Sequence, residues 1–579
     1  MQFLSALKLI SSSSPIRCYS TQHDSRLLAT TRSNMQRSVA SSIIKLLSKS
    51  SAKGGGVRPH QAAVSGAKLG VDKSAASPVS ALQLLAILAV IAWTLFLYMQ
   101  FSVLSAAVEV VVEVSREGRE ADSSADPCRG RYIYVHDLPP RFNADIIRGC
   151  RKSEGHWGDI CASLINAGLG LPLADPTDGV ITGEAGWYGT HQFGLDLIFH
   201  NRMKQYECLI NDSAAAAAVF VPFYAGFDFA RYHWGYDNAT RDAASVDLAD
   251  WLMARPEWRR MWGRDHFLVA GRTGWDFRRS VNYGADWGND LLAMPAGRNM
   301  SVLVLESTFR HSTDYPVPYP TYFHPRSDAD VLRWQDTVRS HNRTWLMAFV
   351  GAPRPDVRMD IRVRDHVIAQ CKAAASSGGA ACGLLACARS PGSVQCHAPG
   401  DIMRLFRKAS FCLQPPGDSY TRRSAFDSVL AGCIPVFFHG ATAYKQYRWH
   451  LPEDHLGYSV YIPGDDVRRR NVSIEAVLRA IPPDTVERMR EEVIKLIPRV
   501  LYADPRSSRL ETIKDAVDVA VEKVLDTVAR IKKGEHVDSG RPIPEDPPNM
   551  YVTTESRFLT KSAVERIVMR LKQWIFGHC

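Results

Sequence analysis

The side chains best suited to bind a negatively charged ligand lie between Phe411 and Phe438, in the string FCLQPPGDSYTRRSAFDSVLAGCIPVFF. The pattern predicts a strand, a Pro/Gly turn that ends at Gly417, a helix and a second buried strand. Asp418 or Ser419 could cap the helix. The amino terminus of a helix behind a glycine loop offers free N–H groups and partial positive charge, which suits a pyrophosphate group.

Three charged side chains follow this turn within a short distance along the chain. Arg422 and Arg423 could add charge-assisted hydrogen bonds to phosphate. Asp427 comes one helical turn later, where its carboxylate could accept hydrogen bonds from two ribose hydroxyls. The alternative is that Asp427 pairs with Arg423 at i, i+4 on a solvated helix face. The residues alone leave both interpretations open.

Short apolar strands alternate with helical segments around this block, which predicts α/β architecture with parallel sheets. Strands are expected within 131–135, 218–222, 265–270, 301–305, 344–350 and the block itself. A composition break at 315–326 separates two such sets, and the chain after Ile481 is mostly helical. This order predicts a GT-B fold, in which two Rossmann-like domains, residues 128–343 and 344–533, face a cleft. A C-terminal tail, 534–579, follows.

The positive charge is concentrated at the start of the chain. The 579 residues have a formal net charge of +10. Residues 1–78 hold eleven Lys or Arg and two Asp, so they account for +9 and leave about +1 for the rest. A nearly neutral folded part disfavours a nucleic-acid partner.

A single membrane span is predicted behind the basic segment. No residue from Ser74 to Val108 is charged, and residues 79–108 are long and apolar enough for a transmembrane signal-anchor. The positive-inside rule places residues 1–78 in the cytosol as a tail, with residues 109–127, which contain six acidic side chains, as a stem on the other side. A mitochondrial transit peptide is the alternative for the Arg- and Ser-rich start, but it does not explain the span.

Sequons and cysteines agree with an oxidising compartment for the folded part. Five N-x-S/T sequons lie beyond the span, and the predicted glycosylation sites are Asn211, Asn238, Asn299, Asn342 and Asn471. Eleven of the twelve cysteines also lie there, so several should pair. Local disulfides are expected within the groups Cys128, Cys150, Cys161 and Cys371, Cys382, Cys387, Cys396. Cys412 and Cys433, in strand-like apolar contexts, are expected to be free buried thiols.

The block at 411–438 resembles the donor-binding region of the exostosin-like glycosyltransferases, family 47, and is especially similar to the plant xyloglucan galactosyltransferase branch. Longer strings between Cys128 and about Val528 share this resemblance: RYIYVHDLPPRF, GWYGTHQFGLDLIFHNRMKQYEC, VFVPFYAGFD, WGRDHFLVA, YPTYFHP and YADPR. Strings of this length are more specific than a short motif. The tail, span and stem before Cys128 are not covered.

The resemblance implies a GT-B fold, a UDP-sugar donor and an inverting reaction, and it favours Asp427 as a contact of the nucleotide. UDP-galactose would then lie on the C-terminal domain, 344–533, and the polysaccharide across the N-terminal one, 128–343. The residues expected around the donor are Gly351, Arg354, Gly417, Asp418, Ser419, Arg422, Arg423 and Asp427.

An inverting transfer needs a general base that deprotonates the acceptor hydroxyl, and four side chains are candidates. His136 and Asp137 follow the first strand, at the edge where open α/β sheets bind ligands. Asp228 follows another strand, and His266 begins one. Each could equally be structural, and the resemblance supports their presence rather than this role.

A metal ion is not expected. Asp328-Ala-Asp330 matches the D-x-D pattern that many metal-dependent transferases use for Mn²⁺, but such strings are frequent by chance. This one precedes a helical pattern, where acidic side chains are favourable at the amino terminus. The two arginines of the donor block and the helix dipole could stabilise the leaving UDP instead.

The sequence therefore predicts a Golgi membrane enzyme that transfers galactose, in β linkage, from UDP-galactose to the xylose side chains of xyloglucan during cell-wall biosynthesis. No cofactor is expected, and a complex with other Golgi glycosyltransferases is possible. Another UDP-sugar, such as galacturonic acid or arabinose, or another hemicellulose acceptor is the alternative. A non-catalytic lectin-like or scaffold protein is the rival from another class, which the presence of Arg422, Arg423 and Asp427 disfavours.

Overall fold

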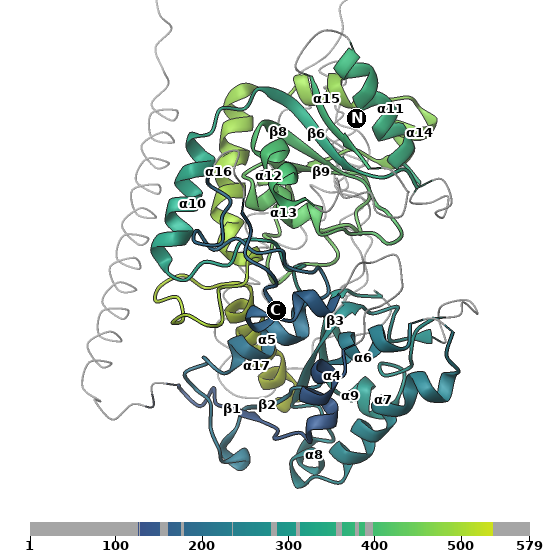
Figure 1. Cartoon of the computed structure of the whole chain (residues 1–579), viewed down its shortest axis with the longest axis vertical. Coiled ribbons are helices and arrows are strands. Elements are labelled where there is room, and N and C mark those ends of the chain that lie inside the picture. The colour runs from purple at the N-terminus through teal and green to yellow at the C-terminus, as the bar shows by residue number, and fades with distance from the viewer. Residues whose placement is uncertain are drawn as a thin grey trace, which may run out of the picture. The chain divides into compact units, whose positions relative to one another are not determined.

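The strands form two separate five-stranded sheets, and every strand pairing in them is parallel (Figure 1). They belong to one unit of the chain, Ser124–Thr553. The computed structural model describes residues 126, 128–150, 160–174, 179–233, 235–279, 287–308, 313–354, 362–376, 381–387 and 398–535. The predicted tail, span and most of the stem lie outside the described residues, as does the C-terminal tail beyond residue 535.

The first sheet has the order β1-β2-β3-β4-β5. Its strands are β1 Ile133–Val135, β2 Ala218–Val221, β3 His266–Thr273, β4 Ser301–Glu306 and β5 Asp314–Pro316. β2 and β4 are buried along their whole length, as expected for parallel strands covered by helices on both faces. The register places Thr273 beside Glu306, so the carboxyl ends of β3 and β4 share one edge.

Six helices follow the strands of the first sheet: α4 Ala144–Arg148, α5 Leu195–Met203, α6 Ala225–Arg231, α7 Asn238–Met253, α8 Pro256–Met261 and α9 Pro295–Asn299. Local sequence explains several of their ends. Asp237 caps α7 by accepting a hydrogen bond from the backbone N–H of Thr240. Pro256 begins α8 at a position whose N–H has no helical partner, and α8 ends at Trp262 in the left-handed region.

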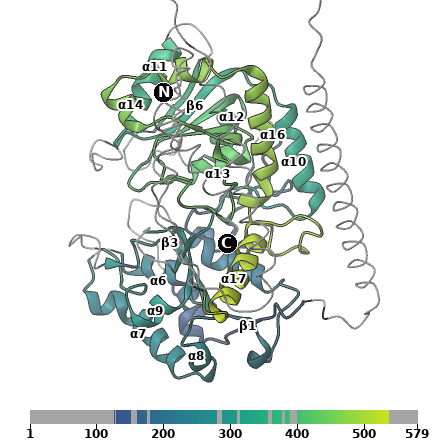
Figure 2. The same ribbon diagram turned by 180° about the vertical axis from the view of Figure 1, so that it is seen from behind.

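The second sheet has the order β10-β9-β8-β6-β7. Its strands are β6 Trp345–Gly351, β7 Cys382–Ala386, β8 Ala409–Gln414, β9 Ile434–Phe437 and β10 Val460–Tyr461. The associated helices are α10 Asp328–Ser340, α11 Arg364–Ser376, α12 Pro399–Arg407, α13 Ser424–Leu430, α14 Gly464–Arg469, α15 Ile474–Arg479 and α16 Pro483–Val500. The long helices α10 and α16 lie side by side (Figure 2).

The last helix, α17 Ala516–Lys532, returns to the first sheet, where it contacts α5 and β2. A buried ion pair fixes it there, because Nε of Arg202 on α5 lies 3.0 Å from Oδ2 of Asp515. Asp515 also caps α17 in a capping box with Asp518. Residues 516–532 therefore pack on the first sheet, although they follow the second one in sequence. The domain limits at 343 and 533 stay a prediction.

The disulfides agree only partly with the prediction. Cys150–Cys161 and Cys371–Cys382 are local, as expected. Cys128 instead pairs with Cys208, 80 residues away, and ties the segment before β1 to the segment before β2. The expectation that Cys412 and Cys433 are free thiols is wrong, because they form a disulfide between β8 and the turn after α13. Apolar strand-like sequence around a cysteine shows burial, and it does not show whether another cysteine lies opposite.

A membrane span cannot be located among these elements. Within the described residues, no helix combines the length and apolar composition that a crossing needs. The predicted span at 79–108 lies outside them.

Candidate active site

The strand order of the second sheet reverses between β6 and β8. From β6 the chain continues to β7 on one side, and it reaches β8, β9 and β10 on the other. In open α/β sheets the loops that leave the carboxyl ends of two such strands diverge, and ligands bind in the crevice between them. Here those loops begin after Gly351 and after Gln414, so both lead into segments expected to bind the donor.

Three arginines surround the loop after β8. Arg354 and Arg422 both pair with Asp418, whose carboxylate oxygens lie 3.0 Å and 3.2 Å from them. The buried Arg364 donates to the carbonyl oxygen of Pro415 at 3.3 Å, and burial, with the charges of its arginine neighbours, lowers its pKa to about 9. One carboxylate, that of Asp418, therefore pairs with two arginines, and a third arginine contacts the same loop. The loop has more guanidinium donors than acidic acceptors, which suits an anionic ligand.

Arg422 folds back over Gly417. Its Nη1 donates to the hydroxyl of Ser419 at 2.7 Å and to the carbonyl of Thr421 at 2.9 Å. A Cβ on Gly417 would lie 2.3 Å from Nε of Arg422, so only glycine allows the guanidinium this position. The turn predicted from Pro-Pro-Gly therefore also accommodates the guanidinium of Arg422.

The helix of the block begins later than predicted. α13 starts at Ser424, and Asp418 and Ser419 do not cap it. Asp418 is held by its arginines, and the hydroxyl of Ser419 donates instead to Oε1 of Glu306 at 2.7 Å. Capping residues are predicted from type alone, and here the same types make long-range contacts.

Arg423 and Asp427 do pair, but not on a solvated face. Nε of Arg423 lies 3.7 Å from Oδ2 of Asp427, and Asp427 is only 2% exposed. Its Oδ1 is buried without a hydrogen-bond partner among the described residues. Burial raises the pKa of Asp427 to about 7, and Arg423 lowers it only in part. A buried carboxylate oxygen without a partner is costly, and it can accept a hydrogen bond from a bound ligand.

Arg423 contacts residues of the segment 128–343, whereas Arg422 contacts its own loop. Its Nη1 donates to the carbonyl of Thr190 at 2.7 Å, and its Nη2 donates to the hydroxyl of Tyr322. The ring of Tyr322 lies under the guanidinium, with 4.0 Å between the guanidinium carbon and the ring centroid. The two adjacent arginines, treated as equivalent from sequence, therefore have different surroundings. Their role in donor binding stays a prediction.

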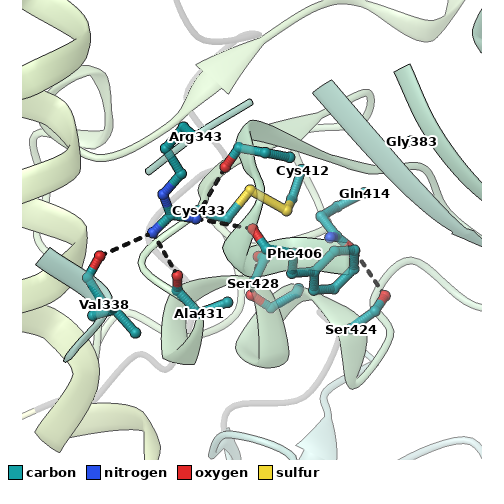
Figure 3. Close-up of a disulfide and its surroundings, with 12 residues drawn as sticks. Val338, Arg343, Gly383, Phe406, Cys412, Gln414, Ser424, Ser428, Ala431 and Cys433 are labelled. Carbon is teal, nitrogen blue, oxygen red and sulfur yellow. Dashed lines mark hydrogen bonds between the residues drawn. A yellow bond between two sulfur atoms is a disulfide. The ribbon is translucent and has the colours of Figure 1, made fainter. Parts of the chain in front are cut away.

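The far end of α13 is fixed by Arg343 and the Cys412–Cys433 disulfide (Figure 3). The guanidinium of Arg343 donates to four carbonyl oxygens, those of Val338, Phe406, Ala409 and Ala431. Three of these carbonyls lie at the carboxyl ends of helices, namely α10, α12 and α13. A cation is favourable at a helix carboxyl terminus. Ser424, at the other end of α13, donates to Oε1 of Gln414 at 2.7 Å.

Glu306 was not among the predicted site residues. It ends β4 of the first sheet, is completely buried, and accepts hydrogen bonds from Tyr319, Ser419 and the backbone of Thr421. Burial raises its pKa, while Arg422 opposes that effect. Glu306 therefore holds the loop between β8 and α13, called the donor-type loop from here on, at the carboxyl edge of the first sheet. Only its place at the end of an apolar strand, in SVLVLE, could have indicated it.

A small pocket opens beside this loop. It lies at the carboxyl edge of the second sheet and is lined by Arg362, Val363, Pro416, Phe438, His439, Gly464, Asp465 and Arg468. These residues come from the segments that follow β8, β9 and β10 and that precede α11. The pocket adds the guanidinium groups of Arg362 and Arg468 to the surroundings of the arginine-rich loop.

Two of the four candidate bases contact each other in the first sheet. Nε2 of His136 lies 3.2 Å from Nε2 of His266, whose Nδ1 lies 2.8 Å from Oδ1 of Asp265. Burial lowers the pKa of His136 to about 4, so it is neutral at physiological pH. Trp251 packs against His136, and Trp258 packs against His266. This enclosure favours the structural interpretation of the pair, and the catalytic role stays a prediction.

The other two candidates differ in burial. Asp137 is exposed. Asp228, on α6 beyond the carboxyl end of β2, is buried and accepts a hydrogen bond from Arg231 through Oδ1. Its Oδ2 has no hydrogen-bond partner in the described part of the chain, and burial raises its pKa. Of the four, Asp228 is the one that combines a raised pKa with an unbonded oxygen, and its role as a base stays a prediction.

Both aspartates of the D-x-D string are occupied by hydrogen bonds. Asp328 accepts from the backbone N–H of Glu511 and from the backbone and hydroxyl of Thr512. Asp330 accepts from the backbone N–H of Arg326 and from Nη1 of Arg333. They lie in the first turn of α10, as predicted for acidic residues there. No cluster of three or more metal-ligating side chains occurs among the described residues.

The sequon side chains differ in accessibility. Asn211, Asn238, Asn342 and Asn471 are exposed. Asn299 is half-buried, and its amide nitrogen donates to the carbonyl of Trp262 at 2.8 Å. Four of the five are therefore accessible to an attached glycan in the folded chain, and glycosylation stays a prediction.

Comparison with known proteins identifies one family model, the exostosin GT47 domain, which matches residues 127–478. Xyloglucan galactosyltransferase MUR3 of Arabidopsis thaliana is 57% identical over 415 residues, or 72% of this chain and 65% of that protein. A probable xyloglucan galactosyltransferase of the same plant, GT12, is 46% identical over 71% of this chain and 79% of that protein. Its xyloglucan-specific galacturonosyltransferase 1 is 36% identical over 70% of this chain and 58% of that protein.

Two solved structures show distant similarity to this chain. A glycosyltransferase from Rickettsia africae ESF-5 matches 70% of this chain and all of that one, with 6% identity and a TM-score of 0.28. The GtfA/B complex matches 50% of this chain and 60% of that one, with 10% identity and a TM-score of 0.25. The fold assignment therefore depends on the strands and their order.

Proposed function

The chain belongs to the exostosin GT47 family, and on this premise we propose that it is an inverting glycosyltransferase that transfers galactose from UDP-galactose to xylose side chains of xyloglucan. MUR3, which its name describes as a xyloglucan galactosyltransferase, is more similar to this chain than the galacturonosyltransferase is, at 57% against 36% identity. This difference favours galactose over galacturonic acid as the transferred sugar. The match covers 65% of MUR3, so the proposal is based on similarity to part of that protein.

The observation that supports donor binding most strongly is the arginine-rich loop at the strand-order reversal of the second sheet. Topology predicts a ligand between the loops after β6 and β8, and those loops hold Arg354 and Arg422 around one carboxylate, Asp418. Two sheets whose carboxyl edges meet at this loop, through Glu306 and Ser419, are the arrangement that a GT-B fold requires.

In the proposed reaction, Arg354, Arg364 and Arg422 hold the diphosphate, and Asp427 accepts hydrogen bonds from the ribose. The acceptor hydroxyl loses its proton to a base, for which Asp228 is the best placed of the candidates by its environment. The acceptor oxygen then attacks the anomeric carbon while the bond to UDP breaks. Donors fixed around the diphosphate stabilise the charge that develops on UDP.

The site needs no metal in this proposal. The arginines provide the positive charge that a cation would otherwise supply, and the oxygens of Asp328 and Asp330 already bond to protein donors. The GT-B architecture and the independence from metal are both part of the proposal.

The proposed location is the Golgi membrane, with a cytosolic tail, one span at 79–108 and a lumenal catalytic part. Four disulfides among the described residues support an oxidising compartment. Protease added to sealed Golgi vesicles should remove only the tail, and a glycosidase should increase the gel mobility of the protected part. A protected amino terminus, or no glycan at all, would contradict this topology.

The experiment that tests the activity is transfer by the purified full chain in detergent. With UDP-galactose and a xyloglucan oligosaccharide, the oligosaccharide should gain one hexose, and the anomeric proton of the product should show a β linkage. Cleavage of UDP-galactose without the gain of a hexose by the oligosaccharide would contradict xyloglucan as the acceptor.

A further inference from the structure

Arg272, on β3 of the first sheet, is a buried cation held in a rigid position. It is 7% exposed. Its guanidinium carbon lies 4.3 Å from the ring centroid of Phe193 and 4.5 Å from that of Phe229. Its Nε donates to the carbonyl of Gly226 at 3.2 Å. Two aromatic faces and one hydrogen bond therefore fix the plane of the guanidinium.

The end of this side chain has no acceptor. Among the residues that the structure describes, only Nε of Arg272 donates a hydrogen bond. Nη1 and Nη2 are not among the buried polar atoms that lack a partner, so they are accessible at the end of the side chain. Arg278, six residues later, shows what a structural arginine of this region does, because its Nη1 and Nη2 bond both oxygens of Asp314 at 2.6 Å and 2.8 Å. The two outer nitrogens of Arg272, unlike those of Arg278, are therefore free to donate to a ligand that reaches them.

The groups that face Arg272 compensate its charge only in part. The charges of Asp276 and Asp196 act on Arg272, together with the hydroxyl of Tyr319. Burial raises the pKa of Asp196 to about 7 and also raises that of Asp276. The oxygens of Asp196 accept from the backbone N–H groups of Gly226 and Gly271, so they are engaged elsewhere.

Arg272 lies at the edge of the first sheet that meets the donor-type loop. It is the residue before Thr273, which pairs with Glu306 across the carboxyl ends of β3 and β4. Glu306 accepts from Tyr319 and from Ser419 of the loop. Glu306, which bonds the loop, and Tyr319, which acts on Arg272, are therefore linked by one hydrogen bond.

The chemistry of the unpaired donors selects the ligand, on the premise of the proposed function. A xyloglucan acceptor is a neutral polysaccharide, whereas a nucleotide sugar has an anionic diphosphate. Two parallel N–H groups of a planar guanidinium match two phosphate oxygens. We propose that Arg272 binds the diphosphate of the nucleotide sugar from the first sheet, opposite Arg422 of the second.

This placement gives Arg272 a role in the transfer step. When the acceptor oxygen bonds to the anomeric carbon, the bond to the diphosphate oxygen breaks and its electron pair stays on UDP, while the acceptor proton passes to the base. The negative charge on the diphosphate increases by one in this step. A fixed guanidinium beside it stabilises the transition state more than the ground state.

The test compares binding of UDP and uridine, by calorimetry and ligand-observed NMR, to the full chain in detergent. The variants are Arg272→Gln, which removes the charge, and Arg272→Lys, which keeps the charge but not the planar fork. Arg141→Gln is the control, because Arg141 lies on the same half of the chain in an exposed pair with Asp247. Wild type must bind UDP more tightly than uridine, or the proposed function itself fails.

The proposal predicts that Arg272→Gln weakens UDP binding by about 10- to 100-fold and leaves uridine binding unchanged. Arg272→Lys should lie between Arg272→Gln and wild type, and the Arg141→Gln control should match wild type. Unchanged UDP affinity with a raised acceptor KM would assign Arg272 to the acceptor and overturn the proposal. Equal weakening of UDP and uridine, with a lower unfolding temperature for both Arg272 variants, would make it structural and also overturn it.

Discussion

The guanidinium of Arg423 lies on the ring of Tyr322, 4.0 Å from its centroid, and also donates to its hydroxyl. Arg423 belongs to the donor-type block, whereas Tyr322 belongs to the segment after the first sheet. With Thr190 and Asp427 as its other partners, Arg423 is held on several sides. This arrangement leaves Oδ1 of Asp427 as the unbonded acceptor of the pair.

We expect Asp427→Asn to weaken UDP binding by about 10- to 150-fold, because a charged hydrogen bond contributes ~1.5–3 kcal/mol. The substitution keeps the size of the side chain, so the fold should survive. Affinity for xyloglucan oligosaccharide should not change. Titration of UDP into wild type and variant measures this directly. Equal affinities would mean that Asp427 only pairs with Arg423. Asp401→Asn, in an exposed pair on α12, is the control.

The raised pKa of Asp427, about 7, predicts a pH dependence. Burial holds the proton on the folded protein, so between about pH 4 and 7 the folded state binds more protons than the unfolded state. The contribution of this group to stability is therefore present at low pH and is lost as pH rises through about 7. Asp427→Asn should remove this decrease in the free energy of unfolding, as measured by urea denaturation between about pH 4 and 7. The same decrease in both proteins would exclude Asp427 as its source.

The same ionisation should make donor binding pH-dependent in the opposite direction. Ribose hydroxyls donate to the ionised carboxylate, so the affinity of wild type for UDP-galactose should increase between pH 6 and 8. UDP-galactose is the suitable probe, because its diphosphate does not titrate in this range. Asp427→Asn should give a flat profile. A pH profile shared by wild type and variant would place the titrating group elsewhere.

Transfer should persist in excess chelator, because the arginines around Asp418 provide the positive charge. Asp328→Asn should retain activity per folded molecule, although it loosens the contacts with Thr512 and lowers the unfolding temperature. Loss of transfer in chelator that Mn²⁺ restores would show that a metal acts in this site. A chelator-resistant wild type with an inactive Asp328→Asn would instead indicate a structural dependence.

Arg343 should be one of the most sensitive positions for stability. Arg343→Met removes donors to four carbonyl oxygens, three of them at helix ends, and we expect a loss of about 3–5 kcal/mol in the free energy of unfolding. Arg339→Met is the matched control, because Arg339 pairs with exposed acids and should cost less than about 1 kcal/mol. Denaturant unfolding of both variants compares them. Similar losses would contradict the role assigned to Arg343.

Sequence patterns predicted the parallel α/β architecture well, because short apolar strands buried on both faces have a distinct composition. They also predicted the ordering strand, turn, helix and strand of the block at 411–438. They did not predict that Asp418 and Ser419 make tertiary contacts instead of capping α13, nor that α17 returns to the first sheet. Such contacts depend on which distant residues fold nearby, as Asp515 on α17 does with Arg202.

The candidate site shows the same limit more clearly. The types and spacing of Arg422 and Asp427 indicated phosphate and ribose chemistry, since that chemistry depends on local charge. Glu306 and Arg272 were not predicted as site residues, because a single charged residue at the end of a strand forms no local pattern. Their importance arises from neighbours that are more than 40 residues away, such as Ser419 for Glu306 and Phe229 for Arg272.

The most direct measurement of the central claim is kcat/KM for transfer to a xyloglucan oligosaccharide with each of three donors. The donors are UDP-galactose, UDP-galacturonic acid and UDP-arabinose, and the Arg422→Gln variant serves as the site control. We predict that UDP-galactose has the highest kcat/KM and that Arg422→Gln reduces it by at least about tenfold. A higher kcat/KM for another donor, or full activity in the Arg422→Gln variant, would contradict the account.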